Sequence, residues 1–304
     1  MYKTRINKIK KYLTNNHLDG IVVCLNTDIY YLTGFFSSTN DSLLYITTNK
    51  NYFITDGRYK NQFFEQVKDF ELIITDSNIY KSLKEILKGK NICDFENISY
   101  KNYLDINKDL LDSENLIFNK RKIKDNQEIK YIKKACDISQ KALIETLKQI
   151  KVGLTEIEIK NILESEMIRF GSEYPAFDTI IAAGKNGALP HAIPTNYKIK
   201  EGNFITIDFG ATYKNYCADI TRTIAIGKPN KKLLEIYKTT LSAKKECERQ
   251  LKEGVNTKEI HKIANSIIEK SGNQFLHSTG HGIGINIHEL PSLSKKSEEV
   301  FRKP

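Results

Sequence analysis

The sequence predicts a protein of two domains, the first of which has an α/β fold. The chain has 304 residues, which corresponds to about two domains at roughly 150 residues each. Helix-like and strand-like patterns alternate over the first 120 residues, and an almost wholly polar stretch, residues 119–130, follows them. Beyond it, helical segments enclose a strand-rich segment. We therefore place the domains at residues 1–119 and 120–304.

Short periodic patterns predict the elements of the first domain. Ile6, Ile9 and Leu13 recur at helical spacing and indicate a helix over residues 4–17. Runs of aliphatic, aromatic and β-branched residues between turn residues indicate strands at 21–25, 43–48, 52–55, 73–75, 92–95 and 116–118. The second and third of these runs flank Asn49-Lys50-Asn51, which predicts a hairpin.

In the second domain, longer patterns predict helices around a strand-rich middle. An amphipathic helix follows the polar stretch and runs to about residue 150. Thr155-Glu-Ile-Glu158 resembles a capping box, so a second helix begins there, and Gly171 ends it. Strand-like sequence starts at Tyr174, and two further helices are predicted at residues 229–252 and 257–271.

Composition excludes several classes of protein. The net charge is +10, but only seven of the 47 cationic residues are Arg and the Lys residues are spread along the chain, so nucleic-acid binding is not expected. The longest aliphatic run, residues 21–25, is far shorter than the ~20 residues of a membrane helix. No apolar signal segment follows the basic N-terminus. Five Cys residues without a CxxC pair predict a reducing, cytoplasmic location.

Two aspartates mark the first group of residues with chemical potential. Residues 204–223 predict a β-hairpin whose turn includes Lys214. A loop at 213–214 pairs Asp208 with Asp219, whereas a loop at 214–215 pairs Asp208 with Thr221. Both registers place the two carboxylates on one face of the sheet. A divalent cation would convert their repulsion into binding. Two solvated aspartates are the alternative, which the apolar neighbours of Asp208 disfavour.

Histidines form the second group. Five of the six lie in the last 115 residues, and four of these, His191, His277, His281 and His288, are the candidates; His281 stands in the glycine-rich segment 279–284. A single His in such a loop is usually structural, but carboxylates together with several imidazoles suit Mn, Co or Zn. No serine or cysteine nucleophile motif competes with this interpretation. His261 lies in a polar helical segment and is predicted to be at the surface.

Several short motifs follow one another between residues 174 and 291. They are Tyr174-Pro-Ala-Phe177, Ala183-Gly184, Pro190-His191-Ala192, Ile207-Asp-Phe-Gly210, Asp219-Ile-Thr-Arg-Thr223, His281-Gly-Ile-Gly284 and His288-Glu289. In this order and at these separations they resemble the pita-bread metallopeptidases, which include aminopeptidase P, prolidase and methionine aminopeptidase. The first half resembles the creatinase-type domain of the proline-specific members, with Thr55-Asp-Gly-Arg-Tyr59 where such a motif is typical.

The resemblance implies a fold and an activity. The fold is an α/β creatinase-like N-terminal domain, with a mixed sheet and flanking helices, followed by an α+β pita-bread catalytic domain. The implied activity is a metal-dependent Xaa-Pro aminopeptidase, which removes the first residue of peptides with proline at the second position. A prolidase restricted to Xaa-Pro dipeptides, or a non-catalytic binding protein on the same scaffold, is the alternative. A homodimer is expected.

The resemblance also implies roles for single residues. Asp208, Asp219 and His281 are expected to bind two divalent metal ions, Mn²⁺ foremost, with Co²⁺ or Zn²⁺ as alternatives. His191 and His288 are expected to contact the substrate and to transfer protons. His277 is expected to line the substrate pocket.

One departure from the family pattern concerns the C-terminus. The family uses two further metal-binding glutamates, one before a Pro-Gly turn and one in an Arg-x-Glu strand. The sequence ends at Pro304 before either motif. We therefore expect a catalytic domain that is incomplete at its C-terminus, with weak metal binding and an inactive chain as the consequence. Glu289 is not expected to substitute, because in a strand it faces away from His288.

Overall fold

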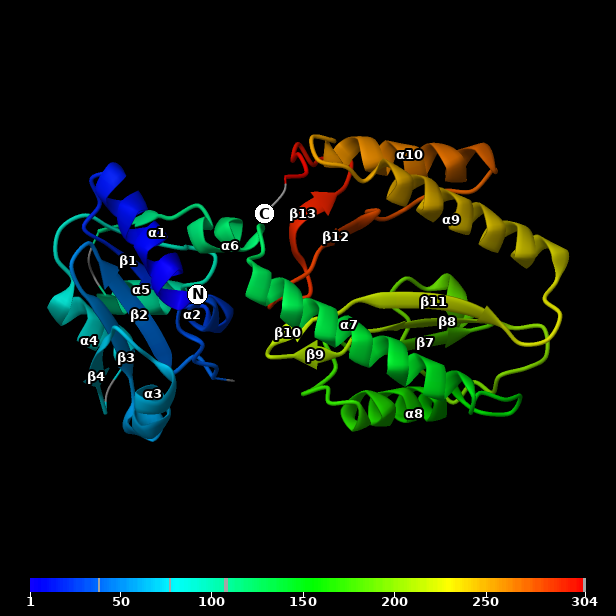
Figure 1. Ribbon diagram of the computed structural model, residues 1–304, viewed down its shortest axis with the longest axis horizontal. Coiled ribbons are helices and arrows are strands. Elements are labelled where there is room, and N and C mark those ends of the chain that lie inside the picture. Colours follow the sequence, from blue (N-terminus) through cyan, green and yellow to red (C-terminus); the bar gives the residue numbers. More distant parts are fainter. Residues whose placement is uncertain (38, 77, 107–108, 303–304) are drawn as a thin grey trace. The chain divides into compact units, whose positions relative to one another are not determined.

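The computed structural model describes residues 1–37, 39–76, 78–106 and 109–302. The chain divides into two compact units, Met1–Arg121 and Lys122–Pro304 (Figure 1). The boundary expected from the sequence, 119/120, falls two residues before the division between these units. Each unit is described separately below.

A six-stranded mixed sheet forms the centre of the first unit. Its strand order is β4-β3-β2-β1-β5-β6, and β2 alone runs antiparallel to its neighbours among the described strands. The strands are β1 (Gly20–Val23), β2 (Ser42–Thr47), β3 (Asn51–Thr55), β4 (Glu71–Ile74), β5 (Asn91–Cys93) and β6 (Leu110–Asp112). The predicted hairpin is confirmed by the antiparallel pair of β2 and β3.

Helices cover this sheet. They are α1 (Tyr2–Asn15), α2 (Asn26–Thr33), α3 (Lys60–Gln66), α4 (Ile79–Ile86), α5 (Tyr100–Ile106) and α6 (Leu116–Arg121), with a 3₁₀ turn, η1, at Gly57–Tyr59. The helical face predicted from Ile6, Ile9 and Leu13 is buried. Leu83 of α4 and Ile106 of α5 pack in one core with residues of β1, β2 and β3. The predicted α/β architecture is therefore confirmed.

The strand predicted at residues 116–118 is wrong, because these residues begin helix α6. The sixth strand, β6, lies earlier in the chain. A short apolar run does not distinguish a buried strand from a buried helical turn. Glu114 and Asn115 adopt positive φ angles of 52° and 58°, which turn the chain out of the sheet after β6. Ile117 is then buried from a helix.

The second unit combines helices with three small antiparallel sheets. Its elements are α7 (Asn126–Leu147), α8 (Glu156–Arg169), β7 (Ile180–Ala183), η2 (Asn186–Ala188), β8 (Phe204–Phe209), β9 (Thr212–Tyr213), β10 (Tyr216–Cys217), β11 (Ile220–Ala225), α9 (Lys231–Gln250), α10 (Thr257–Lys270), β12 (Gly280–Gly282) and β13 (Glu289–Leu293). The strands pair as β11-β8-β7, β10-β9 and β12-β13. Thr155 and Glu158 form the predicted capping box of α8.

The core of the second unit explains which face of β8 is available for chemistry. Ile205, Ile207 and Phe209 are buried in one cluster with residues of α7 and α8. Side chains alternate along a strand, so Thr206 and Asp208 point to the opposite face. Figure 1 shows α9 and α10 on the side of these strands away from α8. Asp208 therefore points to the side of the sheet that α7 and α8 leave uncovered.

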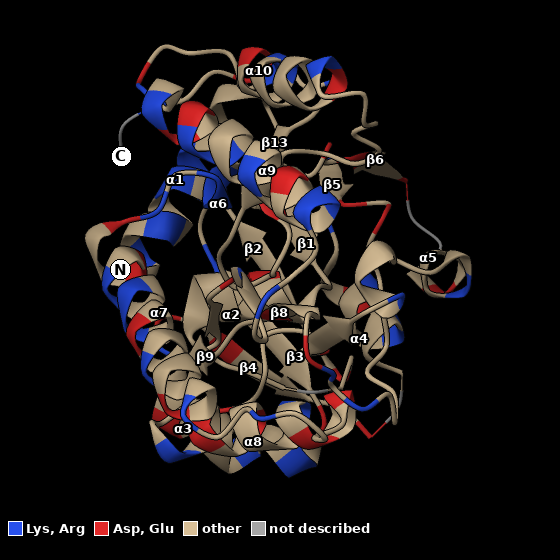
Figure 2. Ribbon diagram, turned by 90° about the vertical axis from the view of Figure 1, so that its right-hand side faces the viewer, with Lys and Arg blue, Asp and Glu red and all other residues tan. Residues whose placement is uncertain are grey.

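Charged residues are mixed along the surface helices. Figure 2 shows Lys and Arg interspersed with Asp and Glu along α7 and α9. Ion pairs such as Lys141–Asp137 and Lys244–Glu248 join the two signs along these helices. Among the described residues, no helix is both long enough and apolar enough to span a bilayer.

Candidate active site

The hairpin that carries both aspartates turns at Lys214 and Asn215. Both residues have positive φ angles, 50° and 57°, as in the type I′ turns that join twisted strands. The register pairs Thr221 with Asp208. The second of the two predicted registers is therefore correct, and Asp219 lies just before β11 as a diagonal neighbour of Asp208.

The two carboxylates lie in a partly buried region of high negative charge. Thr221 Oγ1 donates a hydrogen bond of 2.6 Å to Asp208 Oδ1. Burial raises the pKa of Asp208, although this hydrogen bond opposes the shift. Burial and then the charge of Asp208 raise the pKa of Asp219. The shifts mean that keeping both carboxylates ionised is unfavourable unless a cation lies beside them.

His281, in the glycine-rich segment, and His288, which follows that segment, both interact with Asp219. His281 Nε2 lies 3.5 Å from Asp219 Oδ2, and His281 Nδ1 lies 3.0 Å from the Gly282 carbonyl oxygen. A carbonyl only accepts, so the proton is assigned to Nδ1 and the Nε2 lone pair is left toward Asp219. The rings of His281 and His288 are 4.3 Å apart between centroids. Burial, followed by the charge of His281, lowers the pKa of His288.

The donors suit a divalent metal ion in kind. Two carboxylates and an imidazole are hard to borderline ligands of the sort that Mn, Co and Zn accept. Across the described residues, no three His, Cys, Asp or Glu side chains already stand as a ligand cluster. Asp219 and His281 are paired, whereas Asp208 bonds to Thr221. To bind a metal ion through Oδ1, Asp208 would have to give up its hydrogen bond with the Thr221 hydroxyl.

The other two predicted histidines lie differently. His191 is exposed in the segment after η2, and its charge contributes to the lowered pKa of His288. His277 packs against Phe275, with ring centroids 4.8 Å apart, and its Nδ1 lies 2.7 Å from the Ser278 carbonyl oxygen. Of these two histidines, His191 thus acts on His288 through its charge, whereas His277 contacts Phe275.

The surface prediction for His261 is wrong. The residue is buried, its ring stacks on Phe275, and its Nδ1 lies 3.0 Å from Thr279 Oγ1. Helix α10 packs on the β12–β13 pair through the face that carries Ile260 and Ala264, and His261 is beside it. The polar helical sequence around it gave no sign of this contact.

A buried glutamate that the sequence did not identify holds the segment carrying His191. The carboxylate of Glu156 accepts hydrogen bonds from the backbone of Ala183 (2.8 Å) and Thr195 (2.9 Å). It also accepts from the Asn186 amide (2.9 Å) and the Thr195 hydroxyl (2.7 Å). Both ends of segment 183–195 are therefore fixed to one carboxylate. In the sequence, Glu156 lies inside the capping-box pattern Thr155–Glu158. That pattern predicted the start of a helix but no contact of Glu156 with a distant segment.

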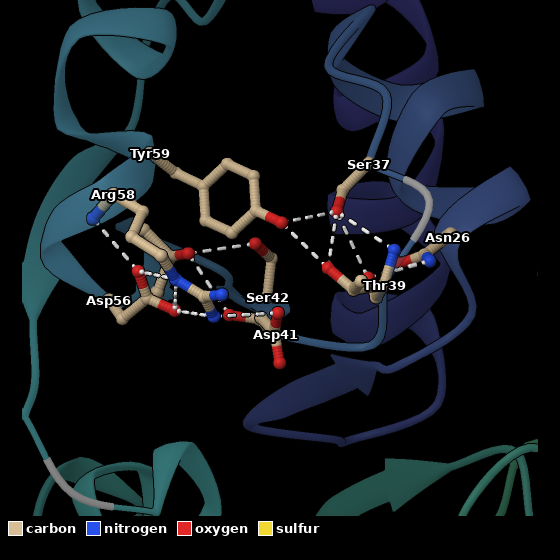
Figure 3. Close-up of polar contacts among 9 residues, drawn as sticks. Asn26, Ser37, Thr39, Asp41, Ser42, Asp56, Arg58 and Tyr59 are labelled. Atoms are coloured by element: carbon tan, nitrogen blue, oxygen red, sulfur yellow. Dashed lines mark hydrogen bonds and ion pairs between the residues drawn. The ribbon is translucent and has the colours of Figure 1, made fainter.

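A separate polar cluster lies in the first unit, around the motif Thr55-Asp-Gly-Arg-Tyr59 (Figure 3). Arg58 Nε and Nη2 bond to the Asp56 carboxylate at 2.6–3.1 Å, and Nη2 also bonds to Asp41 at 2.8 Å. Tyr59 Oη shares hydrogen bonds with Ser37 and Thr39. A cavity of about 710 Å³ adjoins the cluster. Because Asp41 and Asp56 both pair with Arg58, these contacts hold the turn formed by the motif.

A carboxylate–imidazole site of this kind, on antiparallel strands between helix layers and preceded by an α/β domain, defines the class of two-domain pita-bread metallopeptidases. Comparison with known families agrees with this class. Residues 130–303 match metallopeptidase family M24, and residues 5–123 match the creatinase/prolidase N-terminal domain. The chain belongs to metallopeptidase family M24.

Relatives and solved structures extend the comparison. The chain is 32% identical to the Xaa-Pro dipeptidase of Pyrococcus horikoshii, with 98% of this chain and 86% of the relative covered. It is 34% identical to that of Pyrococcus furiosus, with 99% and 88% covered. The structure of an Xaa-Pro dipeptidase from Bacillus anthracis matches with a TM-score of 0.93 and 32% identity, covering 99% of this chain and 87% of that chain.

An aminopeptidase structure is also similar. The X-Pro aminopeptidase from Thermotoga maritima matches with a TM-score of 0.84 and 33% identity, covering 93% of this chain and 84% of that chain. These likenesses confirm the predicted fold, a creatinase-like domain followed by a pita-bread domain. They also confirm the predicted enzyme class, a metallopeptidase of a family whose relatives are Xaa-Pro peptidases.

Proposed function

We propose that this metallopeptidase is an Xaa-Pro dipeptidase, which hydrolyses dipeptides with proline as the second residue. The observation that carries the proposal is the convergence of Asp208, Asp219, His281 and His288 on one face of the catalytic domain. The sequence favoured an Xaa-Pro aminopeptidase and kept the dipeptidase as the alternative. The relatives named above support that alternative better than the first choice.

The proposed metal ligands are Asp208, Asp219 and His281, with Mn²⁺ as the first candidate. A bound divalent ion there supplies Lewis-acid activation of a water and of the scissile carbonyl. The chain contributes two carboxylates whose pKa values are raised, at Asp208 by burial and at Asp219 by burial and the charge of Asp208, so a cation beside them would favour their ionised forms. It also supplies an imidazole whose Nδ1 proton is held by the Gly282 carbonyl oxygen, which orients the ring.

His288 and His191 are the proposed proton-handling groups. The lowered pKa of His288 keeps its imidazole neutral near pH 7, the form that both accepts and donates hydrogen bonds. A neutral His288 can hydrogen-bond the scissile carbonyl as negative charge develops on it. His191 is carried by the segment that Glu156 fixes at both ends.

A cytoplasmic homodimer is part of the same proposal. The five cysteines are free, and four of them are buried, which suits a reducing compartment. Sedimentation of the purified chain tests the dimer directly, since a monomer of 35.0 kDa differs twofold in mass.

The experiment that tests the function compares a dipeptide with a tripeptide. The chain, supplied with Mn²⁺, is incubated with Ala-Pro and with Ala-Pro-Ala, and products are identified by mass spectrometry. Cleavage of Ala-Pro alone supports the dipeptidase. Cleavage of both peptides favours the aminopeptidase, the candidate that the Thermotoga maritima structure supports. Two intact peptides contradict both activities, and Asp219→Asn serves as the control for background hydrolysis.

A further inference from the structure

Glu289 follows His288 directly, yet its side chain is buried. It is 2% exposed, and its Oε2 lies 2.9 Å from Lys124 Nζ, in a side chain that is 13% exposed. Glu289 Oε1 accepts a hydrogen bond of 3.1 Å from the backbone N–H of Asn286. His288, in the bend before β13, is exposed, whereas Glu289, the first residue of β13, is buried, so fixing Glu289 restrains the backbone directly beside His288.

The carboxylate of Glu289 lies directly against the glycine-rich segment that carries His281. A Cβ at Gly284 would stand 2.4 Å from Glu289 Oε2, so a side chain at residue 284 would displace the carboxylate from this position. The Gly284 carbonyl accepts a hydrogen bond of 2.7 Å from the backbone N–H of Cys217, two residues before Asp219. The glycine-rich segment is therefore held between Glu289 on one side and the aspartate hairpin on the other.

Lys124 connects this arrangement to the start of α7. It precedes Asp125, the N-cap residue whose capping box with Glu128 fixes the first turn of the helix. The Glu128 carboxylate also accepts a hydrogen bond of 3.1 Å from Tyr216 Oη, in the same hairpin. The start of α7 thus contacts the hairpin through Glu128, and through Lys124 it contacts Glu289, which lies against the glycine-rich segment.

We propose that the Glu289–Lys124 pair is a positioning pair for the candidate active site. It fixes segment 280–289 so that His281 and His288 stay opposite Asp219. A buried ion pair adds little net stability over apolar residues of similar volume, but its charges require one geometry. The proposal rests on the proposed function in one respect only, because it takes His281 and His288 as functional residues of the active site.

Hydrogen exchange read by mass spectrometry tests this role without metal or substrate. We expect Glu289→Gln and Lys124→Met, each in the full chain, to raise exchange in peptides covering 280–289 by about tenfold, because local opening becomes easier. Glu156→Gln is the matched control, since it removes a buried carboxylate that holds segment 183–195 instead. It should raise exchange there and leave 280–289 unchanged. Unchanged exchange at 280–289 in Glu289→Gln overturns the proposal, as does an equal rise throughout the second unit.

A double variant separates positioning from plain stability. Lys124→Met/Glu289→Met replaces the ion pair with apolar side chains, and we expect it to unfold near the wild-type urea midpoint. Its affinity for Mn²⁺, measured by calorimetry, should still fall about tenfold, the lower end for groups that orient metal ligands. A double variant that recovers stability, slow exchange and Mn²⁺ affinity together contradicts a positioning role. A wild-type chain that binds no Mn²⁺ contradicts the proposed function, while the exchange comparison still decides the role of the pair.

Discussion

At the residue scale, Asp219 shows how a candidate metal ligand can reduce the stability of the metal-free fold. An aspartate whose pKa is raised on folding stabilises the fold most when protonated. That contribution is lost as the pH rises above the unfolded value of about 3.9. At pH 7 the charged Asp219, beside Asp208, therefore opposes folding.

Asp219→Asn should consequently raise the free energy of unfolding of the metal-free chain at pH 7 by about 0.5 kcal/mol. It should also abolish the stabilisation that added Mn²⁺ gives the wild type. Urea unfolding with and without Mn²⁺ measures both effects. Asp137 is the control, because Lys141 and Lys134 lower its pKa, so Asp137→Asn should change stability in the opposite direction. A metal-free Asp219→Asn chain that is less stable than the wild type would contradict the argument.

Two glycines of the same segment make a second prediction at this scale. A Cβ at Gly284 would meet the Glu289 carboxylate at 2.4 Å, whereas a Cβ at Gly280 meets nothing within 4 Å. Gly284→Ala should cost about 2 kcal/mol, within the range of overpacking substitutions. Gly280→Ala should stay within about 0.5 kcal/mol of the wild type. Chemical denaturation of both variants checks the difference, and equal stabilities would show that the segment adapts freely.

At the scale of elements, local patterns predicted most helices and strands but not their long-range partners. The hairpin could be reduced to two registers, both with Lys214 in the turn, and the choice between them depended on Asn215 rather than Tyr213 adopting a positive φ angle. The strand expected at 116–118 was wrong because its length left helix and strand equally possible.

The sequence analysis missed Glu156 and Lys124 for the same reason. The partners of Glu156 lie 27 to 39 residues further along the chain, and Lys124 lies 165 residues before Glu289. No periodicity within one element reports such a contact. The predicted residues, by contrast, stood in motifs that a resemblance could identify, such as Asp219-Ile-Thr-Arg-Thr223.

The packing of α10 on the β12–β13 pair makes the stability of this part of the molecule depend on pH. Burial, then the charges of Lys295 and His277, lower the pKa of His261. A histidine with a lowered pKa is fully stabilising above the unfolded value of about 6.5. Its contribution falls as the pH drops from there through the folded value.

We therefore expect the urea midpoint of the wild type to decrease as the pH is lowered from 7.5 to 5.5. His261→Gln should reduce this dependence of the midpoint on pH. His17, which is exposed and lies in the first unit, provides the control, because His17→Gln should leave the slope unchanged. Identical slopes in the wild type and His261→Gln would show that other groups cause the pH dependence.

At the scale of the whole molecule, one side chain near the division into two units was assigned by composition to the second domain, whereas it packs in the first unit. Residues 119–130 are polar, so the boundary was expected at 119/120. Arg121, however, is buried in the first unit, and its Nη1 lies 2.7 Å from Asp28 Oδ1 and 3.2 Å from Thr27 Oγ1. Both charged side chains are at most 4% exposed. A polar stretch thus contains a core residue of the preceding domain.

This contact predicts where the first unit can be separated. A fragment of residues 1–121 keeps the six-stranded sheet and its helices, and we expect it to unfold cooperatively in urea. A fragment of residues 1–119 loses Arg121 and leaves Asp28 buried without that guanidinium. Removing one partner of a buried ion pair typically costs about 3 kcal/mol or more, so the shorter fragment should be less stable by about that amount. Far-UV circular dichroism during urea titration measures both.

The substitution Asp28→Asn separates loss of the ion pair from the loss of two terminal residues. In fragment 1–121 it should destabilise the sheet nearly as much as the truncation does. Adding it to fragment 1–119 should not destabilise that fragment further by the same amount, because the truncation and the substitution act on one interaction. Additive losses would show that Lys120 and Arg121 stabilise the unit through other contacts. Equal stability of the two unsubstituted fragments would place the boundary at 119 after all.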